Sequence, residues 1–344
     1  MRVGIVGFGY MGRTRLDALR AIGADGVDIE VVGVVDPHVP EFHGAGVPVH
    51  GRVPLLPDLN SLLLLEPDWV IIAAPHRTAA ESCRRVLAAG PQVLIEKPMG
   101  RNLEEAQSLA ASQVRNRQLC VGLNYRFFEG IGRLLLDVRQ GVFGPLVSAS
   151  ILMGHGYQPG MERNWKLDPE EAGGGVLIDP GSHLFDLARL LAGDDLTPAC
   201  GLGYRGFWRT GVEEECHLLL HARELPIVNV QLSVVRWRST FRVEVFGEDG
   251  YGIVEGRGRS YGQQTYRVGR RWGWRSGLRQ RETETLVCRT DGATVFEREL
   301  RALLVPGEDL PLPPASAESA LATMRLIDAC ERTLQGNGGQ ALLS

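Results

Sequence analysis

Two acidic residues and a histidine stand close together in the second half of the chain. Asp179 precedes His183 by four residues, and Asp186 follows it by three. On a helix these separations put both carboxylates and the imidazole on one face. A histidine beside a carboxylate is held in one tautomer and can accept a proton near neutral pH. The spacing therefore predicts a proton-transfer site.

A lysine is the second chemical signal, because this chain almost never uses one. Lys97 and Lys166 are the two lysines among 37 basic residues, and all the others are arginine. A buried ammonium can lose its proton, whereas a guanidinium stays charged. Lys97 stands near the end of an apolar segment, just before Pro98, which cannot continue a strand ladder. We therefore expect Lys97 to exchange a proton or bind a reacting oxygen.

Glycines near the N-terminus predict a dinucleotide site. Gly7, Gly9 and Gly12 have the spacing G-x-G-x-x-G, between an apolar segment at 2–7 and a helical pattern at 13–23 that ends at a glycine. The first glycine allows a tight turn, the second lets a pyrophosphate approach, and the third lets the helix pack closely. The alternative is a glycine-rich turn that binds nothing.

Asp36 ends the next predicted strand, residues 29–36. Its carboxylate would accept hydrogen bonds from the adenosine ribose, and its charge would repel a 2′-phosphate, so the pattern favours NAD over NADP. The residues that we assign to the cofactor are Gly7, Phe8, Gly9, Tyr10, Met11, Gly12, Asp36, Ala74, Pro75, His76, Glu96 and Lys97.

Strands and helices alternate through the first 120 or so residues. Gly90 is expected to end one helix, and Asn102 to cap the next. The alternation predicts an α/β fold with a doubly wound parallel sheet, whose ligands lie at the carboxyl ends of the strands. The helical patterns cover 58–67, 78–90 and 102–117, and the strand patterns 68–75, 92–98 and 118–127.

Length and composition describe a globular protein. With 344 residues, 44% of them hydrophobic and 23% charged, the chain predicts about two domains. A net charge of -4 argues against a nucleic-acid or membrane-binding surface. Six scattered cysteines are typical of reduced thiols. We expect a cytoplasmic protein with no nucleic-acid partner, no membrane and no bound metal.

Three segments resemble one family. They are "EKP" at 96–98, "NYRF" at 124–127 and "GGGVLIDPGSHLFDLARLL" at 173–191. The family is the glucose–fructose oxidoreductase, inositol dehydrogenase and MocA-like group (Gfo/Idh/MocA), whose G-G-G-x-x-x-D-x-G-x-H-x-x-D segment is matched at every position. His76 departs from the family pattern, which often has histidine at Ala79 instead, so His76 is expected to contact cofactor or substrate in its own way.

The resemblance implies a domain order. An N-terminal Rossmann domain at 1–122 would precede a substrate-binding and oligomerisation α+β domain at 123–315, and a helix at 316–335 would return beside the first domain. The second domain would hold a large, open, mostly antiparallel sheet that forms a homodimer or homotetramer. Its expected strands lie at 200–208, 215–222, 227–235, 241–247 and 251–256.

The resemblance also implies roles. Lys97, Asp179 and His183 would surround the carbon that exchanges hydride with the nicotinamide. His183 would take the hydroxyl proton, Lys97 would stabilise the same oxygen, and Asp179 would orient His183 or relay protons. The implied activity is NAD(H)-dependent oxidoreduction of a secondary alcohol on a sugar, sugar derivative or cyclitol. The polyhydroxylated substrate would be bound by Asn124, Arg126, Tyr157, Trp165, Lys166, Asp179 and His183.

Purely structural roles are also open to these residues. Asp179 could cap a helix, and His183 could be a hydrogen-bonded core histidine. The two could also bind a metal, although no third ligand stands nearby. Lys166 could bind an anionic group or be solvated.

The protein could also be an NAD-dependent glycoside hydrolase that oxidises its substrate transiently, or a non-catalytic NAD-binding sensor.

Arginine and aromatic residues are dense at 257–281. The segment holds eight arginines together with Tyr261, Tyr266, Trp272 and Trp274. A solvated hairpin edge, a subunit interface and a grip on a nucleotide or phosphate are the alternatives.

Overall fold

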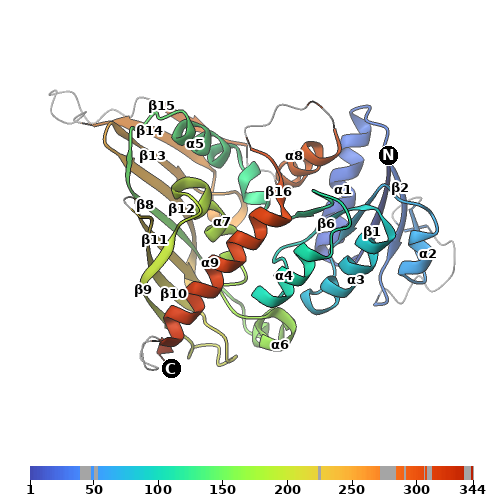
Figure 1. Cartoon of the computed structure of the whole chain (residues 1–344). Coiled ribbons are helices and arrows are strands. Elements are labelled where there is room, and N and C mark those ends of the chain that lie inside the picture. Colours follow the sequence, from blue (N-terminus) through green and yellow to red (C-terminus); the bar gives the residue numbers. More distant parts are fainter. Residues whose placement is uncertain are drawn as a thin grey trace. The chain divides into compact units, whose positions relative to one another are not determined.

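A computed structural model shows two compact units. They comprise residues 1–123 with 293–321, here the N-terminal unit, and 124–292 with 322–344, here the sheet unit (Figure 1). Residues 293–315 fell in the second of the predicted domains. They pack with the N-terminal unit, because Leu300 and Leu304 of helix α8 (Gly292–Leu304) lie in its core. The residues described are 1–38, 48–49, 53–223, 226–271, 284–289, 292–305, 307, 312–336 and 342–343.

The N-terminal unit is built on the predicted doubly wound sheet. Its strand order is β16-β7-β6-β5-β1-β2-β4-β3, and all pairs are parallel except those of the edge strands β16 and β3. The chain builds outward from β1 on one side and then, from β5, on the other, so the carboxyl end of β1 is a topological switch point. The strands are β1 Arg2–Val6, β2 Glu30–Val35, β3 Pro48–Val49, β4 Val53–Leu56, β5 Trp69–Ile72, β6 Gln92–Ile95, β7 Leu119–Val121 and β16 Ala315–Ser316.

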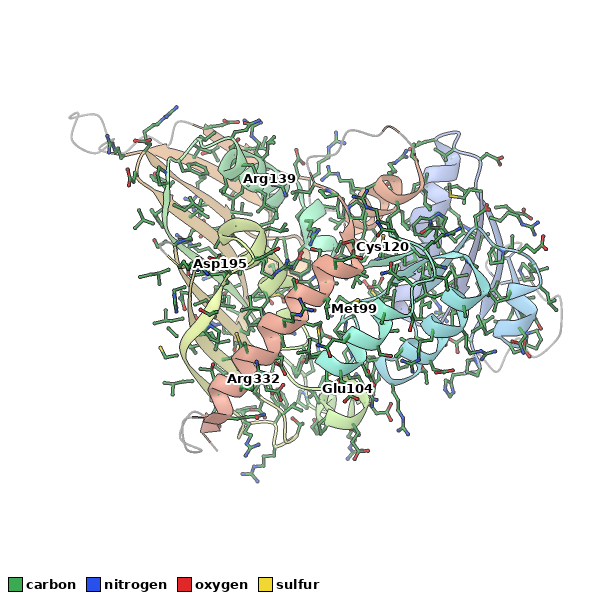
Figure 2. All side chains as sticks on the ribbon, viewed as in Figure 1. Met99, Glu104, Cys120, Arg139, Asp195 and Arg332 are labelled. Atoms are coloured by element: carbon green, nitrogen blue, oxygen red, sulfur yellow. The ribbon has the colours of Figure 1, made fainter. Side chains whose placement is uncertain are left out.

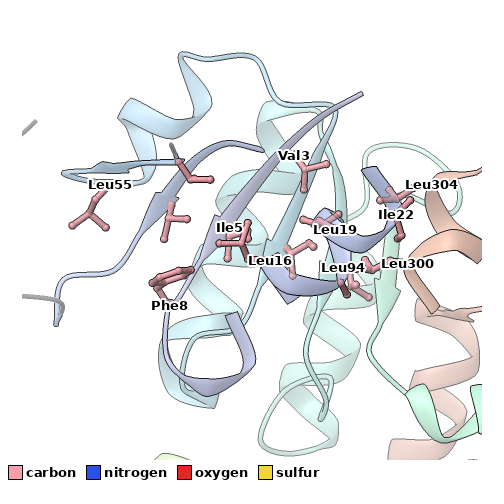
Figure 3. Packing of buried hydrophobic residues seen from close by; sticks show 14 residues of the cluster. Val3, Ile5, Phe8, Leu16, Leu19, Ile22, Leu55, Leu94, Leu300 and Leu304 are labelled. Atoms are coloured by element: carbon pink, nitrogen blue, oxygen red, sulfur yellow. The ribbon is translucent and has the colours of Figure 1, made fainter. Parts of the chain in front are cut away.

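Buried aliphatic side chains join this sheet to its helices. Val3 and Ile5 of β1 pack with Leu16 and Leu19 of α1, and with Leu300 of α8 (Figure 3). Strands that are covered on both faces need such continuous apolar runs, which is the pattern that predicted them. The other helices of the unit are α1 Tyr10–Ala24, α2 Leu59–Leu63, α3 His76–Ala89 and α4 Leu103–Ala111.

Two helix ends are those that the sequence predicts. Gly90 ends α3 with a left-handed φ of 109°, which only glycine adopts freely. Asn102 caps α4 through a hydrogen bond that its side chain accepts from the Glu105 N–H, at 2.9 Å.

Three helix boundaries were predicted wrongly. Helix α1 does not end at Gly23, because the left-handed glycine that follows it is Gly26. Helix α2 stops at Leu63 rather than at 67, since Pro67 cannot continue a helix. Helix α4 stops at Ala111 rather than at 117. Beyond it, the side chain of Gln118 accepts the Val114 N–H, so a side chain replaces the helical carbonyl.

The sheet unit contains a nine-stranded sheet among the residues described, in the order β15-β14-β13-β12-β8-β11-β10-β9-β17. All its pairs are antiparallel except β8 with β11 and β9 with β17. The predicted large, mostly antiparallel sheet is therefore confirmed. The strands are β8 Leu146–Gly156, β9 Thr197–Tyr204, β10 Glu215–His221, β11 Ile227–Ser233, β12 Val235–Gly247, β13 Gly250–Glu255, β14 Thr265–Arg270, β15 Glu284–Val287 and β17 Leu342–Leu343.

Helices lie against one face of this sheet. Helix α7 contacts β8 and β11, and α5 contacts β13 and β14 (Figure 1). Burial alternates along β10, where Cys216, Leu218 and Leu220 face the helices. No helix within the described ranges is long and apolar enough to cross a bilayer. The helical segments are η2 Asn124–Phe127, α5 Glu129–Arg139, η3 Met161–Arg163, η4 Trp165–Leu167, α6 Pro169–Ala172, α7 Gly181–Ala192, η5 Arg259–Tyr261 and α9 Ala317–Gly336.

Candidate functional site

The glycine turn of the N-terminal unit has the geometry of a phosphate cradle. Gly7 has a φ of 88°, and a Cβ on Gly12 would lie 2.0 Å from the Gly7 carbonyl oxygen. A Cβ on Gly9, in contrast, would meet nothing within 4 Å. Gly9 is also the N-cap of α1, and no side chain caps its N–H groups. Open space before uncapped N–H groups fits the pyrophosphate of a dinucleotide.

Asp36 lies directly beside this turn. Its Oδ2 accepts the backbone N–H of Phe8 at 2.6 Å, and its Oδ1 accepts that of His38 at 2.8 Å. The carboxylate is therefore fixed at the carboxyl end of β2. A carboxylate can accept further hydrogen bonds, so this arrangement fits recognition of a ribose hydroxyl.

The remaining N-terminal candidates also follow strands. Ala74 and Pro75 lie between β5 and α3, and His76 is the first residue of α3, two residues before the predicted start of that helix. Tyr10 and Met11 begin α1. All of these residues lie at the carboxyl edge of the sheet, where ligands of doubly wound folds bind.

Lys97 follows β6 at the same edge. The preceding Glu96 accepts a hydrogen bond from the Arg15 Nε at 2.7 Å, and Arg15 also contacts Glu299 at 2.6 Å. Arg15 is 0% exposed, so this charged cluster is internal. Met99, labelled in Figure 2, is 1% exposed and anchors the segment after Lys97. Glu96, predicted to contact the cofactor, is therefore bound by an internal arginine.

In the sheet unit, the segment 173–181 is packed against the partly buried carboxylate of Glu213. Glu213 accepts the N–H groups of Gly175 and Leu177, both at 3.0 Å. A Cβ on Gly175 would lie 2.1 Å from the Glu213 carbonyl oxygen, so no larger residue fits. Burial raises the pKa of the Glu213 carboxyl, and the two hydrogen bonds oppose that shift. The segment is therefore held firmly where it leads into Asp179.

Asp179 does not lie on a helix, contrary to the prediction from its spacing. Helix α7 begins at Gly181, with Pro180 as its N-cap residue, so Asp179 stands one residue outside. The Oδ2 of Asp179 accepts a hydrogen bond from Lys166 Nζ at 2.8 Å. The chain's second lysine thus binds a carboxylate of the predicted site, and its side chain is 43% exposed.

His183 lies on α7 and is 5% exposed. Its ring stacks on that of Tyr125, with the centroids 3.8 Å apart and the planes at 4°. This stacking fixes the plane of the imidazole. Asp186, three residues on, was predicted as a partner of His183. In the structure its carboxylate binds Arg126, whose Nε donates to the Asp186 Oδ2 at 2.7 Å.

Residues 124–127 form the 3-10 helix η2, so the predicted strand at 118–127 was wrong beyond Val121. This turn buries Asn124 and Arg126, at 6% and 3% exposure. Arg126 supports α7 through Asp186, which is a positioning contact. Tyr157 follows β8, and Trp165 and Lys166 lie in the short η4.

Sequence reasoning missed a second histidine. The Nδ1 of His155, on β8, lies 2.9 Å from the Tyr261 hydroxyl. The Arg257 guanidinium lies over the rings of Tyr261 and Tyr125, at 4.2 and 5.1 Å. Burial, and then the charge of Arg257, lower the pKa of His155, so its ring is neutral near pH 7. A lone histidine in a strand gave no motif that could have revealed this.

The charge of Asp179 reaches these rings. Burial is the main cause of the raised pKa of Tyr157, and the negative charge of Asp179 adds to it. The same charge acts on His155 and Arg257. The charge of Asp179 therefore acts on a polar, aromatic surface, here the aromatic wall, that is made by His155, Tyr157, Arg257 and Tyr261. Such a wall suits a ring that carries several hydroxyl groups.

The arginine-rich segment at 257–281 divides into parts with different surroundings. Arg257 and Tyr261 belong to the wall just described. Tyr266 is 0% exposed, and its hydroxyl donates to Asp137 at 2.6 Å. Trp272 and Trp274 lie outside the described residues. Within the described residues, no three His, Cys, Asp or Glu side chains gather as a metal site would require.

Comparison with known proteins identifies the family. Residues 1–125 match the model of an oxidoreductase family with an NAD-binding Rossmann fold, and residues 137–252 match the GFO/IDH/MocA C-terminal domain. The chain belongs to the Gfo/Idh/MocA family. Its members are NAD(P)-binding oxidoreductases of sugars and cyclitols.

Individual Gfo/Idh/MocA relatives are distant. The chain is 30% identical over 200 residues to the rhizopine catabolism protein MocA of Rhizobium meliloti, covering 57% of this chain and 58% of that protein. It is 27% identical over 202 residues to levoglucosan dehydrogenase of Pseudarthrobacter phenanthrenivorans, covering 56% and 52%. The matches thus span little more than half of each relative.

A solved structure of the family shares the fold over nearly the whole chain. The complex of levoglucosan dehydrogenase with NADH and levoglucosan superposes with a TM-score of 0.80 at 16% identity. It covers 97% of this chain and 96% of that one. At this identity the likeness establishes the Gfo/Idh/MocA architecture and leaves the substrate to be argued from the site.

Proposed function

We propose that this protein is an NAD-dependent oxidoreductase that interconverts a secondary alcohol and a ketone on a sugar or cyclitol-like substrate. The observation that carries the proposal is the position of Asp179. The segment that leads into it includes Gly175, which tolerates no larger residue; Lys166 donates a hydrogen bond to it, and its charge acts on Tyr157 and His155. A carboxylate fixed in this way beside polar rings serves chemistry on a hydroxylated substrate.

The bound cofactor supplies the hydride acceptor for oxidation or the hydride donor for reduction. His183 accepts the proton of the substrate hydroxyl, and Tyr125 keeps its ring in one plane. Lys97 donates a hydrogen bond to the same oxygen and stabilises charge that develops there. Asp179 orients His183, while Lys166 fixes the Asp179 carboxylate from the other side. Asn124, Trp165 and Tyr157 complete the substrate pocket in this proposal.

NAD is the proposed cofactor in preference to NADP. The Asp36 carboxylate is fixed beside the glycine turn by Phe8 and His38. An additional phosphate on the ribose would meet this negative charge.

We also propose that the protein is a homodimer or homotetramer through the outer face of the large sheet. That face exposes Leu202, Leu219, Ile227 and Phe246 by 40% to 55%. An apolar surface of this kind on a sheet is commonly an interface. Light scattering on the purified protein tests this, and a Leu219→Glu variant is expected to be monomeric.

The proposed activity is tested by incubating the protein with NAD or NADP and a panel of inositols, hexoses, sugar acids, nucleotide sugars and glycosides. NADH absorbance and product analysis are recorded on the same samples. Net NADH formation with one polyol supports the proposal. Cleavage of a glycoside without net NADH would replace it with the transient-oxidation hydrolase, and no reaction across the panel would favour a sensor.

A further inference from the structure

Aromatic rings continue from the proposed site to the surface of the sheet unit. The ring of Tyr157 lies 6.1 Å from that of Trp208, and Trp208 lies 6.3 Å from Trp237. Phe207 contacts both tryptophans, at 5.1 and 5.3 Å. Phe207 is 52% exposed and Trp237 66%. Solvent-exposed aromatic rings in contact with each other mark a binding surface more often than a structural one.

Four arginines flank these rings along the chain. Arg205 and Arg209 stand on either side of Phe207 and Trp208, and Arg236 and Arg238 on either side of Trp237. Across the described part of the chain, none of the four side chains has an ion pair or a hydrogen bond. Nearby Arg242, in contrast, binds both Glu244 and Glu255. In a chain of net charge -4, these four arginines place positive charge beside the aromatic residues along the chain.

The loop that carries Phe207 is held by a buried carboxylate. Glu214 is 0% exposed. It accepts the N–H groups of Phe207 and Trp208 at 2.9 and 2.8 Å, and those of Gly206 and Arg209 at 3.3 and 3.1 Å. Arg209 has a φ of 56°, which is uncommon for a residue with a side chain. Burial of a charge and a left-handed residue both cost stability. Here the buried Glu214 and the left-handed Arg209 fix the backbone of the loop, and with it the direction in which Phe207 points.

A large bulge in β12 presents Trp237. Between the pairs Val235–Gly156 and Thr240–Gly154, β12 has four residues where β8 has only His155. Bulges re-aim side chains next to functional sites. A Cβ on Gly156 would lie 2.6 Å from the Trp237 ring, so the ring packs directly on this strand. The bulge therefore lies opposite His155, the histidine of the aromatic wall.

We infer that these aromatic rings and the four arginines, together the arginine–aromatic face, bind the nucleoside diphosphate half of a nucleotide-sugar substrate. The inference rests on the proposed function, because it places the sugar half beside Tyr157 and Asp179. An exposed ring stacks on a nucleobase whatever its identity. Guanidinium groups bind phosphate oxygens through charge-assisted hydrogen bonds. A free sugar or cyclitol would leave both features unused.

Charge selects this occupant over a second copy of the chain. Self-association through the arginine–aromatic face about a two-fold axis would bring like charges together, which is unfavourable. A diphosphate would supply anionic oxygens for guanidinium groups that bind no carboxylate within the described residues. Its position between base and sugar matches a face that begins at Tyr157 and ends at the exposed Trp237.

The test is binding of UDP, GDP and dTDP to the full chain, by calorimetry, with NAD at saturation so that the Rossmann site is filled. Wild type is expected to bind at least one of them, more tightly than uridine or inorganic pyrophosphate binds. Trp237→Ala is expected to weaken binding about 5- to 100-fold, in line with the loss of one stacked base. Arg209→Ala is expected to weaken it and to reduce its salt dependence.

Two matched variants serve as controls. Val287→Ala removes an exposed apolar side chain of β15, away from the proposed sites, and Arg325→Ala removes an exposed arginine on α9. Both are expected to bind the diphosphates as wild type does. Equal binding by Trp237→Ala and wild type would overturn the inference. So would a change in oligomeric state of Trp237→Ala with no change in diphosphate affinity, because the face would then be a subunit contact.

This experiment separates the inference from the proposed function. If a free sugar is oxidised with NAD and Trp237→Ala leaves kcat/KM unchanged, the inference fails and the function stands. If the face binds UDP but no nucleotide sugar, free sugar or cyclitol exchanges hydride with NAD, the function fails and the binding site stands.

Discussion

Two glycine-rich segments, 7–12 and 173–181, use their glycines for different purposes. In both, a glycine lies against a backbone oxygen: a Cβ would be 2.0 Å from the Gly7 oxygen at Gly12, and 2.1 Å from the Glu213 oxygen at Gly175. In the first segment, however, Gly9 opens onto free space. Gly174, Gly175 and Gly181 of the second all meet neighbours within 4 Å.

The difference separates a binding motif from a positioning motif. The first segment presents its own backbone N–H groups to a ligand, so it needs one glycine that touches nothing. The second positions Asp179, which it contains, and His183, which follows it, so its glycines serve to pack the segment against its neighbours. A glycine pattern therefore predicts a ligand only where space remains beside it.

The largest effect should come from removing what the second segment positions. His183→Ala is expected to lower kcat about 10²- to 10⁴-fold, the usual contribution of a general acid–base. Lys97→Ala should abolish turnover in the same way. NAD affinity should stay within about threefold in both, because the cradle is unchanged. Steady-state kinetics and NAD titration measure this.

His217→Ala, at an exposed histidine of β10, is the control and should retain activity. Loss of NAD binding in His183→Ala, with turnover per bound cofactor unchanged, would contradict the assignment of catalysis to His183 and of cofactor binding to residues 7–12.

The two glycine segments can be compared directly by adding one methyl group to each. Gly175→Ala is expected to lower the free energy of unfolding of the sheet unit by about 1–3 kcal/mol, because the Cβ meets backbone. Gly9→Ala should change it by less than about 0.5 kcal/mol and should weaken NAD binding about tenfold or more. Urea unfolding and NAD titration on both variants give the two quantities.

Gly23→Ala is the matched control inside α1, where a Cβ meets nothing within 4 Å. It should raise stability slightly and leave NAD affinity unchanged. Equal NAD affinity in Gly9→Ala and wild type would show that the first segment does not bind the cofactor through its backbone.

His155, in the aromatic wall, should make the free energy of unfolding depend on pH. Its folded-state pKa is lowered by burial, Arg257 and Lys166, against the opposing charge of Asp179. Below the unfolded pKa of about 6.5, the unfolded chain binds a proton that the folded chain does not. Stability from this residue is therefore present above about pH 6.5 and falls with acidification, by up to about 1.4 kcal/mol per pH unit.

His155→Gln should reduce this slope between about pH 7.5 and 5.5 in urea unfolding. The exposed His217→Gln should leave it unchanged. An unaltered slope in His155→Gln would mean that the residue is solvated.

The smallest effect should concern the first segment's choice of cofactor. Asp36→Asn keeps an acceptor for the Phe8 N–H and removes only the charge. The ratio of NADP to NAD affinity is expected to rise about 5- to 10-fold. Asp28→Asn, an acid outside the turn, is the control. An unchanged ratio would contradict the assignment of Asp36 to the ribose.

The sequence predicted the first segment better than the second for a physical reason. A phosphate cradle is made by backbone within six consecutive residues, so its spacing is visible in the chain. The wall beside Asp179 is made by side chains from distant strands, such as His155 and Tyr261, which only the sheet register brings together. Nor could the spacing of Asp179 and His183 show that Pro180 puts the helix start between them.

Hydride transfer between a polyhydroxylated substrate and the dinucleotide is the central claim for this chain. With the substrate that the panel identifies, deuterated at the reacting carbon, mass spectrometry of the cofactor after a single turnover tests it most directly. We predict deuterium in the reduced nicotinamide for wild type, and almost none for His183→Ala, with NAD still bound, over the time in which wild type completes this turnover. Product formation with unlabelled cofactor and deuterium released to water would contradict the claim.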